Sequence, residues 1–332
     1  MAGWNDIIGR NQIKEHLKHV IETGKVGHAY MFSGEKGSGK RLLASTWAMA
    51  LQCTSEKERP CGICHDCKQA SGGNHPDIIY VTHEKPNSIG VEDVREQLVG
   101  DVQIRPYSGR YKIYIIPEAE KMTVQAQNAI LKTIEEQPAY AVIILLTSNE
   151  QYFLDTIRSR CTILNLKPVP DEQVKAYLME HIQVPDYQAD ICVAFAQGNI
   201  GKAIRLASSE DFNTIKDSAM QLIKNAGTME IHEIADAVKG IQEYKISIQD
   251  YLDILALWYR DMVYFKATRD VDGIIFKDQI RNIREAVKIC SYEGAEAVMN
   301  AIETAKARLN ANVNFDLTME LLFLVIKENM HD

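Results

Sequence analysis

The sequence lacks a long apolar run, because no stretch reaches the roughly 18 residues that a membrane-spanning helix needs. Residues 1–11 are polar and lack the apolar core of a signal peptide. An excess of positive charge is also missing, since 37 Lys and Arg stand against 45 Asp and Glu, for a net charge of -8. Non-specific DNA affinity comes from cations that neutralise phosphates, so we do not expect a chain that coats nucleic acid unaided.

These absences predict a cytoplasmic protein without a membrane partner. Thiols stay reduced in the cytoplasm, so clustered cysteines there indicate a metal site rather than disulfides.

The first half of the chain alternates short β-rich runs with helical patterns. Runs of this kind, separated by helices, are typical of a parallel sheet with crossovers. We therefore predict an α/β domain over residues 1–167 with a five-stranded parallel sheet. The expected strands are Ala29–Ser33, Asp77–Val81, Lys112–Ile116, Val142–Thr147 and Thr162–Leu166.

The strand pattern ends at Leu166, and Pro168 and Pro170 follow it as residues that interrupt regular structure. The remainder reads as amphipathic helix, with a further boundary expected at Ser208–Ser209. We predict a small helical domain over 168–209 and a larger all-α domain over 210–332. The clearest helical runs in the larger domain are Ile248–Tyr264, Tyr292–Leu309 and Leu317–Glu328.

A phosphate-binding loop is predicted where the spacing G-x-x-x-x-G-K follows the Ala29–Ser33 run and opens a helical pattern. Glycines allow a tight loop whose N–H groups face phosphates, and the helix N-terminus favours anions. A Gly-rich turn with an accidental Lys is the alternative. The residues expected to bind ATP or ADP phosphates are Gly34, Gly37, Ser38, Gly39 and Lys40.

The same loop lacks the residues that hold Mg²⁺ in working ATPases. The place of the Ser or Thr hydroxyl after the lysine is taken by Arg41, and Pro117 stands where an apolar strand should end in a metal-binding Asp. Glu118 follows Pro117, either as a remnant catalytic base or as a solvated loop carboxylate. Phosphoryl transfer depends on the cation, so we expect little or no hydrolysis and no Mg²⁺ site.

Four of the seven cysteines form the pattern C-x7-C-x2-C-x2-C, within a module of about residues 53–67. Two CxxC steps that share Cys64 bring several thiolates to one tetrahedral ion, and four thiolates leave no position for water. This predicts structural Zn²⁺ held by Cys53, Cys61, Cys64 and Cys67. A redox CxxC is the rival interpretation. We expect the nearby His65 and His75 to be surface histidines.

Taken together, these residues resemble the AAA+ clamp loaders of bacterial DNA polymerase III, and most closely the delta-prime family. The resemblance covers nearly the whole chain and is densest from Asp6 to Leu166. It is carried by the loop, the cysteine module and the segments Trp4–Gly9, Ala126–Glu136, Val142–Asn149, Thr156–Cys161 and Ala305–Phe315.

The resemblance implies that Ser159, Arg160 and Cys161 hold the place of an arginine finger, with Arg160 acting in trans on a neighbouring ATPase. An ordinary surface ion pair is the alternative for Arg160. Asn149 would stand in the place of the polar sensor, or only cap a strand end. Lys202 departs from the sensor arginine that is usual in the small helical domain.

The resemblance also implies partners: gamma/tau and delta subunits in a hetero-pentameric ring, closed by the helical last third as a collar. Through that complex the chain would meet a sliding clamp and primed DNA. The region 88–95 would face the DNA. The candidate contacts are Arg95, Arg105 and Arg110, and for each of them a solvated surface charge is an equal alternative.

Three hypotheses follow from the sequence. The first is a non-hydrolysing stator subunit that lends Arg160 to a partner. The second is an active gamma/tau-like ATPase, which would need Mg²⁺ ligands that Arg41 and Pro117 do not provide. The third is a zinc-dependent nucleic-acid module with a vestigial loop, which the net charge of -8 disfavours.

Overall fold

The computed structural model describes residues 3–136, 138–241, 248–311 and 313–330. Backbone contacts divide the chain into two compact units, Met1–Val174 with Gln197–Lys202, and Lys175–Ala196 with Ala203–Asp332. Within the described residues, every helix is too short or too polar to cross a membrane.

The first unit is built on a parallel sheet with the strand order β2-β3-β4-β1-β5. The strands lie where the sequence predicts them, within one residue at their ends. Their bounds are β1 (Ala29–Ser33), β2 (Ile78–Tyr80), β3 (Lys112–Ile116), β4 (Ala141–Thr147) and β5 (Thr162–Asn165).

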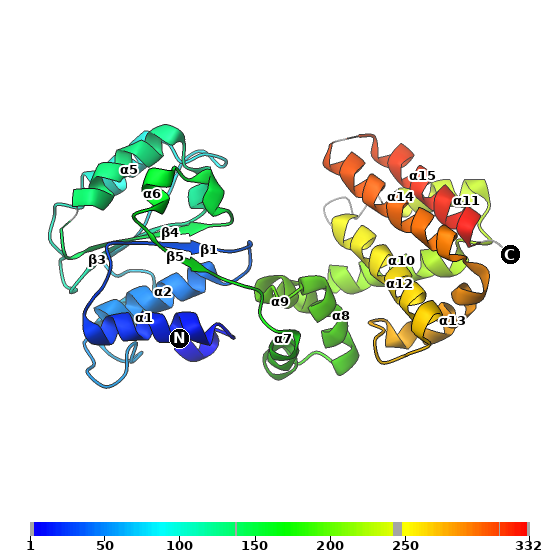
Figure 1. Ribbon diagram of the computed structural model, residues 1–332, viewed down its shortest axis with the longest axis horizontal. Coiled ribbons are helices and arrows are strands. Elements are labelled where there is room, and N and C mark those ends of the chain that lie inside the picture. The colour runs from blue at the N-terminus through cyan, green and yellow to red at the C-terminus, as the bar shows by residue number, and fades with distance from the viewer. Residues whose placement is uncertain (1–2, 137, 242–247, 312, 331–332) are drawn as a thin grey trace. The chain divides into compact units, whose positions relative to one another are not determined.

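Both faces of the sheet are covered, which is why its central strands read as continuous apolar runs. Side chains alternate between faces along a strand. Tyr30 and Phe32 of β1 join one core with Trp47 of α2 (Lys40–Gln52), and Met31 joins the other core with Ile130 of α5 (Val124–Glu136). Figure 1 shows α1 and α2 on one side of the sheet and α5 and α6 on the other.

Short helices complete the first unit. The α-helices other than α2 and α5 are α1 (Asn11–Thr23), α3 (His65–Ser71), α4 (Val91–Val94), α6 (Asp155–Arg158) and α7 (Asp171–Tyr177), which ends in the second unit. The 3₁₀ turns are η1 (Trp4–Asp6), η3 (Ala119–Lys121) and η4 (Glu150–Tyr152), and a π-helical turn, η2 (Arg95–Val99), continues α4.

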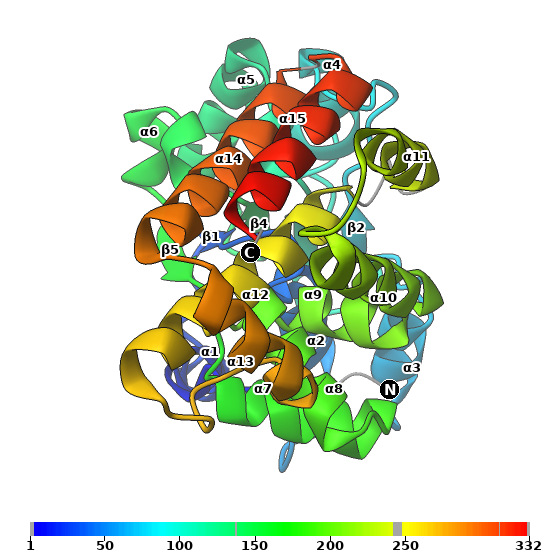
Figure 2. The same cartoon turned by 90° about the vertical axis from the view of Figure 1, so that its right-hand side faces the viewer.

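The second unit is helical throughout its described part. The expected long helices are present, slightly longer than predicted, as α12 (Ile248–Thr268), α14 (Tyr292–Asn310) and α15 (Phe315–Asn329). Figures 1 and 2 both show α14 and α15 side by side, with α12 packed against α14. The remaining elements are η5 (Leu178–Ile182), α8 (Asp186–Ala196), α9 (Ile200–Ser208), which starts in the first unit, α10 (Glu210–Asn225), α11 (Ile231–Ile241), η7 (Lys277–Gln279) and α13 (Ile280–Ile289).

Helix starts in this unit follow local capping chemistry. Ser209 accepts a hydrogen bond from the N–H of Phe212 at the start of α10, so the expected boundary at Ser208–Ser209 is a helix junction. Ser291 and Asn314 cap α14 and α15 in the same way. The division into domains 168–209 and 210–332 stays a prediction.

A buried carboxylate fixes the edge of the sheet. Asp77, just before β2, accepts hydrogen bonds from the N–H groups of Tyr107 (2.6 Å), Gly109 (2.7 Å) and Ser108 (2.8 Å). Burial raises the pKa of this carboxyl, but the three donors outweigh it, and the pKa lies below its ordinary value. The loop before β3 is therefore tied to β2 by one ionised side chain.

We expect Asp77→Ala to destabilise the first unit by about 2–3 kcal/mol, because three N–H groups lose an ionised acceptor. Since the folded pKa is depressed, this contribution is present above the unfolded pKa and is lost as the pH falls through the folded one. Urea unfolding of wild type and Asp77→Asn from pH 7 to pH 3 measures it, with Asp155→Asn, whose side chain is 94% exposed, as the control. Equal acid sensitivity of wild type and Asp77→Asn would contradict the assignment.

Candidate functional sites: a phosphate loop, a cysteine cluster and an exposed arginine

The predicted phosphate loop runs from the end of β1 to the start of α2 at Lys40. Gly37 and Gly39 both adopt φ of +88°, a conformation that other L-residues rarely adopt. The N–H of Gly34 donates to the carbonyl of Thr147 at the end of β4, which anchors the loop to the sheet. The backbone therefore has the strand–loop–helix form that cradles phosphates.

Lys40 folds back onto its own loop. Its Nζ donates to the carbonyl of Gly34 and, at 2.8 Å, to that of Glu35. Burial lowers the pKa of the Lys40 ammonium, which the carboxylate of Glu120 opposes and the charge of Arg10 reinforces. Arg10, which the sequence analysis did not single out, thus adds a second cation beside the loop.

Asn199 and Gly201 dock on the loop from the start of α9. The Asn199 Nδ2 donates to the carbonyl of Lys36 at 2.8 Å, while its Oδ1 caps α9 by accepting from the N–H of Lys202. The N–H of Gly201 donates to the carbonyl of Gly37 at 3.0 Å. A Cβ on Gly201 would lie 2.6 Å from that carbonyl oxygen, so only glycine fits. The Gly-Asn-Ile-Gly sequence at 198–201 was the available signal, and it was missed.

The positions that should hold Mg²⁺ carry other contacts. Arg41 lies over the ring of Tyr80, with its guanidinium carbon 5.4 Å from the ring centre. Pro117 ends β3, and Glu118 pairs with Lys121 at 2.7 Å, a hydrogen bond that lowers the pKa of Glu118. Asn149 is exposed, and its side chain accepts from the N–H of Gln151, so it caps η4.

The four clustered cysteines come together after α2. Their sulfur atoms all lie within 4.8 Å of one another. A tetrahedral ion with Zn–S bonds of about 2.3 Å needs sulfurs about 3.8 Å apart, so the cluster fits with a small contraction. Burial raises the pKa of the Cys64 thiol, but hydrogen bonds, from the N–H groups of Thr54 and Cys67 among others, bring it to about 6. The four thiols can hold a metal ion such as zinc.

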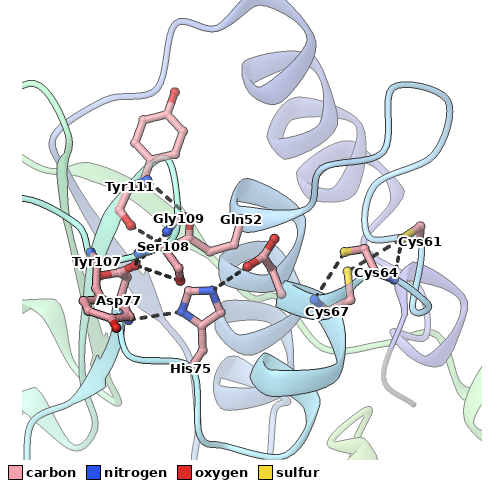
Figure 3. Close-up of polar contacts among 11 residues, drawn as sticks. Gln52, Cys61, Cys64, Cys67, His75, Asp77, Tyr107, Ser108, Gly109 and Tyr111 are labelled. Atoms are coloured by element: carbon pink, nitrogen blue, oxygen red, sulfur yellow. Dashed lines mark hydrogen bonds and ion pairs between the residues drawn. The ribbon is translucent and has the colours of Figure 1, made fainter.

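His75 contradicts the prediction of a surface histidine, since it is only 4% exposed, whereas His65 is exposed as expected. Its Nδ1 accepts from the N–H of Asp77, and its Nε2 lies 3.6 Å from the carboxylate of Asp66. Asp66 stands on α3 between Cys64 and Cys67. Figure 3 shows the contacts from His75 through Asp77 to the loop at Tyr107, with the cysteine cluster nearby.

Gln52 adds a second tie between the same regions. It is the last residue of α2, and its amide exchanges two hydrogen bonds with the backbone of Tyr111, next to β3. The cysteine module begins directly after it, at Cys53. Both ends of the module are therefore anchored to the sheet edge.

The predicted arginine finger lies at the turn between α6 and β5. The Nε of Arg160 pairs with the carboxylate of Glu135 at 2.9 Å, and Nη1 donates to the carbonyl of Thr156 at 2.8 Å. The side chain remains 41% exposed. Burial raises the pKa of the neighbouring Cys161 to about 12, so this thiol stays protonated.

The candidate DNA-facing arginines lie on the surface and do not form one cluster of hydrogen bonds. Arg95 pairs with Glu92 at 3.2 Å. Arg105 is exposed, and Arg110 lies over the ring of its neighbour Tyr111.

Comparison with known proteins agrees with this geometry. The sequence model of a family described as "DNA polymerase III, delta subunit" matches residues 9–170. The chain is 29% identical to DNA polymerase III subunit delta' of Bacillus subtilis over 96% of each chain. It is 27% identical to subunit tau of the same organism, over 83% of this chain but only 53% of tau.

A solved structure, a DNA polymerase III gamma subunit-related protein of Thermotoga maritima, matches 96% of this chain and 99% of its own with a TM-score of 0.50 and 20% identity. The likeness is one of fold: a five-stranded parallel sheet with a strand–loop–helix of the phosphate-binding form, followed by helices. These matches relate the chain to the clamp-loader subunits of DNA polymerase III.

We expect one metal equivalent per chain, and its removal by a chelator should speed amide exchange in α3 and at Tyr107–Gly109 about tenfold or more, because the His75–Asp77 contacts join the two regions. His75→Ala should retain the metal yet loosen Tyr107–Gly109, while His65→Ala should retain the metal and leave exchange at Tyr107–Gly109 unchanged. Hydrogen exchange with mass spectrometry and metal analysis provide the readouts. Unchanged exchange at Tyr107–Gly109 on chelation would show that the contacts carry no coupling.

Proposed function

We propose that this chain is a delta-prime-like stator of the clamp loader, which hydrolyses little or no ATP itself and lends Arg160 to the active site of a neighbouring ATPase subunit. The observation that carries the proposal is the placement of Arg160 relative to the chain's own phosphate loop.

Arg160 and the loop lie at opposite ends of two neighbouring parallel strands, since Arg160 precedes β5 and the loop follows β1. Tyr30 of β1 pairs in register with Thr162 of β5. The loop begins at Gly34, four residues after Tyr30, and Arg160 comes two residues before Thr162, so at about 3.3 Å per residue the two are roughly 20 Å apart along the strands. One arginine side chain does not bridge that length, which supports action in trans.

The chemistry of the chain's own loop supports the other half of the proposal. Arg41 and Pro117 supply no oxygen for Mg²⁺, and the cation is needed to neutralise charge on a transferring phosphoryl group. Lys40 remains, with the loop N–H groups, as a site for ATP or ADP. An arginine from outside, by contrast, needs only an exposed guanidinium, which Arg160 has.

Similarity along the chain supports a delta-prime-like subunit rather than a motor. The match to delta' extends over 96% of both chains, whereas the chain spans about half of tau or less. The partners proposed for it are gamma/tau and delta subunits in a hetero-pentameric ring, and through them the sliding clamp and primed DNA. Residues 210–332 would form the collar, and 168–209 the lid.

Zinc in the four-cysteine cluster is proposed as structural, held by Cys53, Cys61, Cys64 and Cys67. The cluster contains only thiol ligands, and its neighbours Asp66 and His75 contact each other and, through His75, the N–H of Asp77 at the sheet edge. The ion would hold the module in shape.

The cytoplasm is the proposed location of the protein.

An active gamma/tau-like ATPase is the alternative, favoured by 36% identity to subunit tau of Salmonella typhimurium over 178 residues. ATP turnover by the purified chain with Mg²⁺ separates the two functions. The stator should show no turnover above background. Robust turnover that Lys40→Ala abolishes would establish the motor instead.

Arg160→Ala should leave a folded chain that still assembles, but should slow hydrolysis at the neighbouring ATPase site by about 10³-fold, the scale of an arginine finger. Assembly with a single hydrolysis-competent partner next to this chain isolates that site in single-turnover measurements. Arg158→Ala, which removes an adjacent arginine paired with Asp155, is the matched control and should be near wild type. Unchanged turnover for Arg160→Ala would refute the proposal.

A further inference from the structure

The guanidinium of Arg160 is held by two separate elements. One is its own turn, where Nη1 donates to the carbonyl of Thr156 at 2.8 Å and to the Oγ of Ser159 at 3.3 Å. The other is the last turn of α5, where Glu135 pairs with Nε at 2.9 Å. Glu135 lies in α5 and is far from Arg160 in sequence, so this contact exists only because α5 and α6 pack on one face of the sheet.

These contacts engage one edge of the guanidinium and leave another open. Nη2 makes no hydrogen bond within the described part of the chain. Both side chains of the pair are about two-fifths exposed, at 41% for Arg160 and 40% for Glu135. An exposed arginine loses rotamer freedom when it is immobilised, and here the contacts with Glu135 and Thr156 restrict the side chain before any partner arrives.

We propose that Glu135 is a positioning residue for Arg160, orienting the free edge of the guanidinium toward the phosphoryl group of the neighbouring subunit. The inference rests on the proposed role of Arg160 in trans and assigns a residue that supports it. In this role Glu135 acts entirely through its ion pair with Arg160.

The neighbouring residue offers a matched control. Glu136 stands next in the same helix end, carries the same charge and pairs instead with Lys132 at a marginal 4.0 Å. A general effect of negative charge at the end of α5 would follow from either residue. An effect through Arg160 would follow from Glu135 alone.

The test is made in the assembled loader with one hydrolysis-competent partner beside this chain. We expect Glu135→Ala to lower kcat at that site about tenfold and Glu135→Gln about threefold, because glutamine keeps a neutral acceptor for Nε but loses the charge. KM for ATP and assembly should stay unchanged, since the finger acts on the transition state. Glu136→Gln should match wild type.

A double-mutant cycle separates this inference from the proposed function. In an Arg160→Ala background, Glu135→Ala should cause no further loss, because its only route of action is gone. An equal loss in both backgrounds, or a raised kcat for Glu135→Ala, would overturn the positioning role. If Arg160→Ala lowers kcat while Glu135→Ala does not, the positioning role of Glu135 is refuted and the stator proposal stands. If Arg160→Ala itself leaves kcat unchanged, the stator proposal is refuted.

Discussion

The two-sided pairing of β1 is the constraint on which the first unit depends. Its five residues are buried on both faces and hydrogen-bond to β4 on one side and β5 on the other. A central parallel strand has no freedom to slip, because a shift of one residue would turn each apolar side chain to the wrong core. The loop at its carboxyl end and the turn that enters β5 are fixed by the same register. The separation between the phosphate loop and Arg160 is thus a property of strand pairing rather than of the loops.

Elements with local signals could be predicted from the sequence. The strands were found because β1, β3 and β4 are continuous apolar runs between turn residues, and the long helices of the second unit because their apolar residues recur at helical spacing. The spacing of Cys53, Cys61, Cys64 and Cys67 likewise indicated their convergence. All three signals lie within short windows of the chain.

Contacts between distant segments escaped prediction for a physical reason. His75 is polar and has no apolar run around it, so a surface position was expected. It is buried because it contacts Asp66 on α3 with one ring nitrogen and the N–H of Asp77 at the sheet edge with the other. Glu135 gave no signal that distinguished it from Glu136 beside it. Asn199 stands 163 residues after the carbonyl that it binds. Local patterns do not specify which side chains meet when separate elements pack.

The approach of Gly201 to Gly37 gives the phosphate loop a second reason for its composition. Gly37 needs a positive φ, and its carbonyl receives the N–H of Gly201 in a space that has no room for a Cβ. Both requirements would persist in a chain that never met a nucleotide, because they serve the seating of α9. Selection against side chains at these two positions can therefore outlast enzymatic activity. Glycines that persist in such a loop can reflect the packing of a helix against it as much as the binding of a ligand.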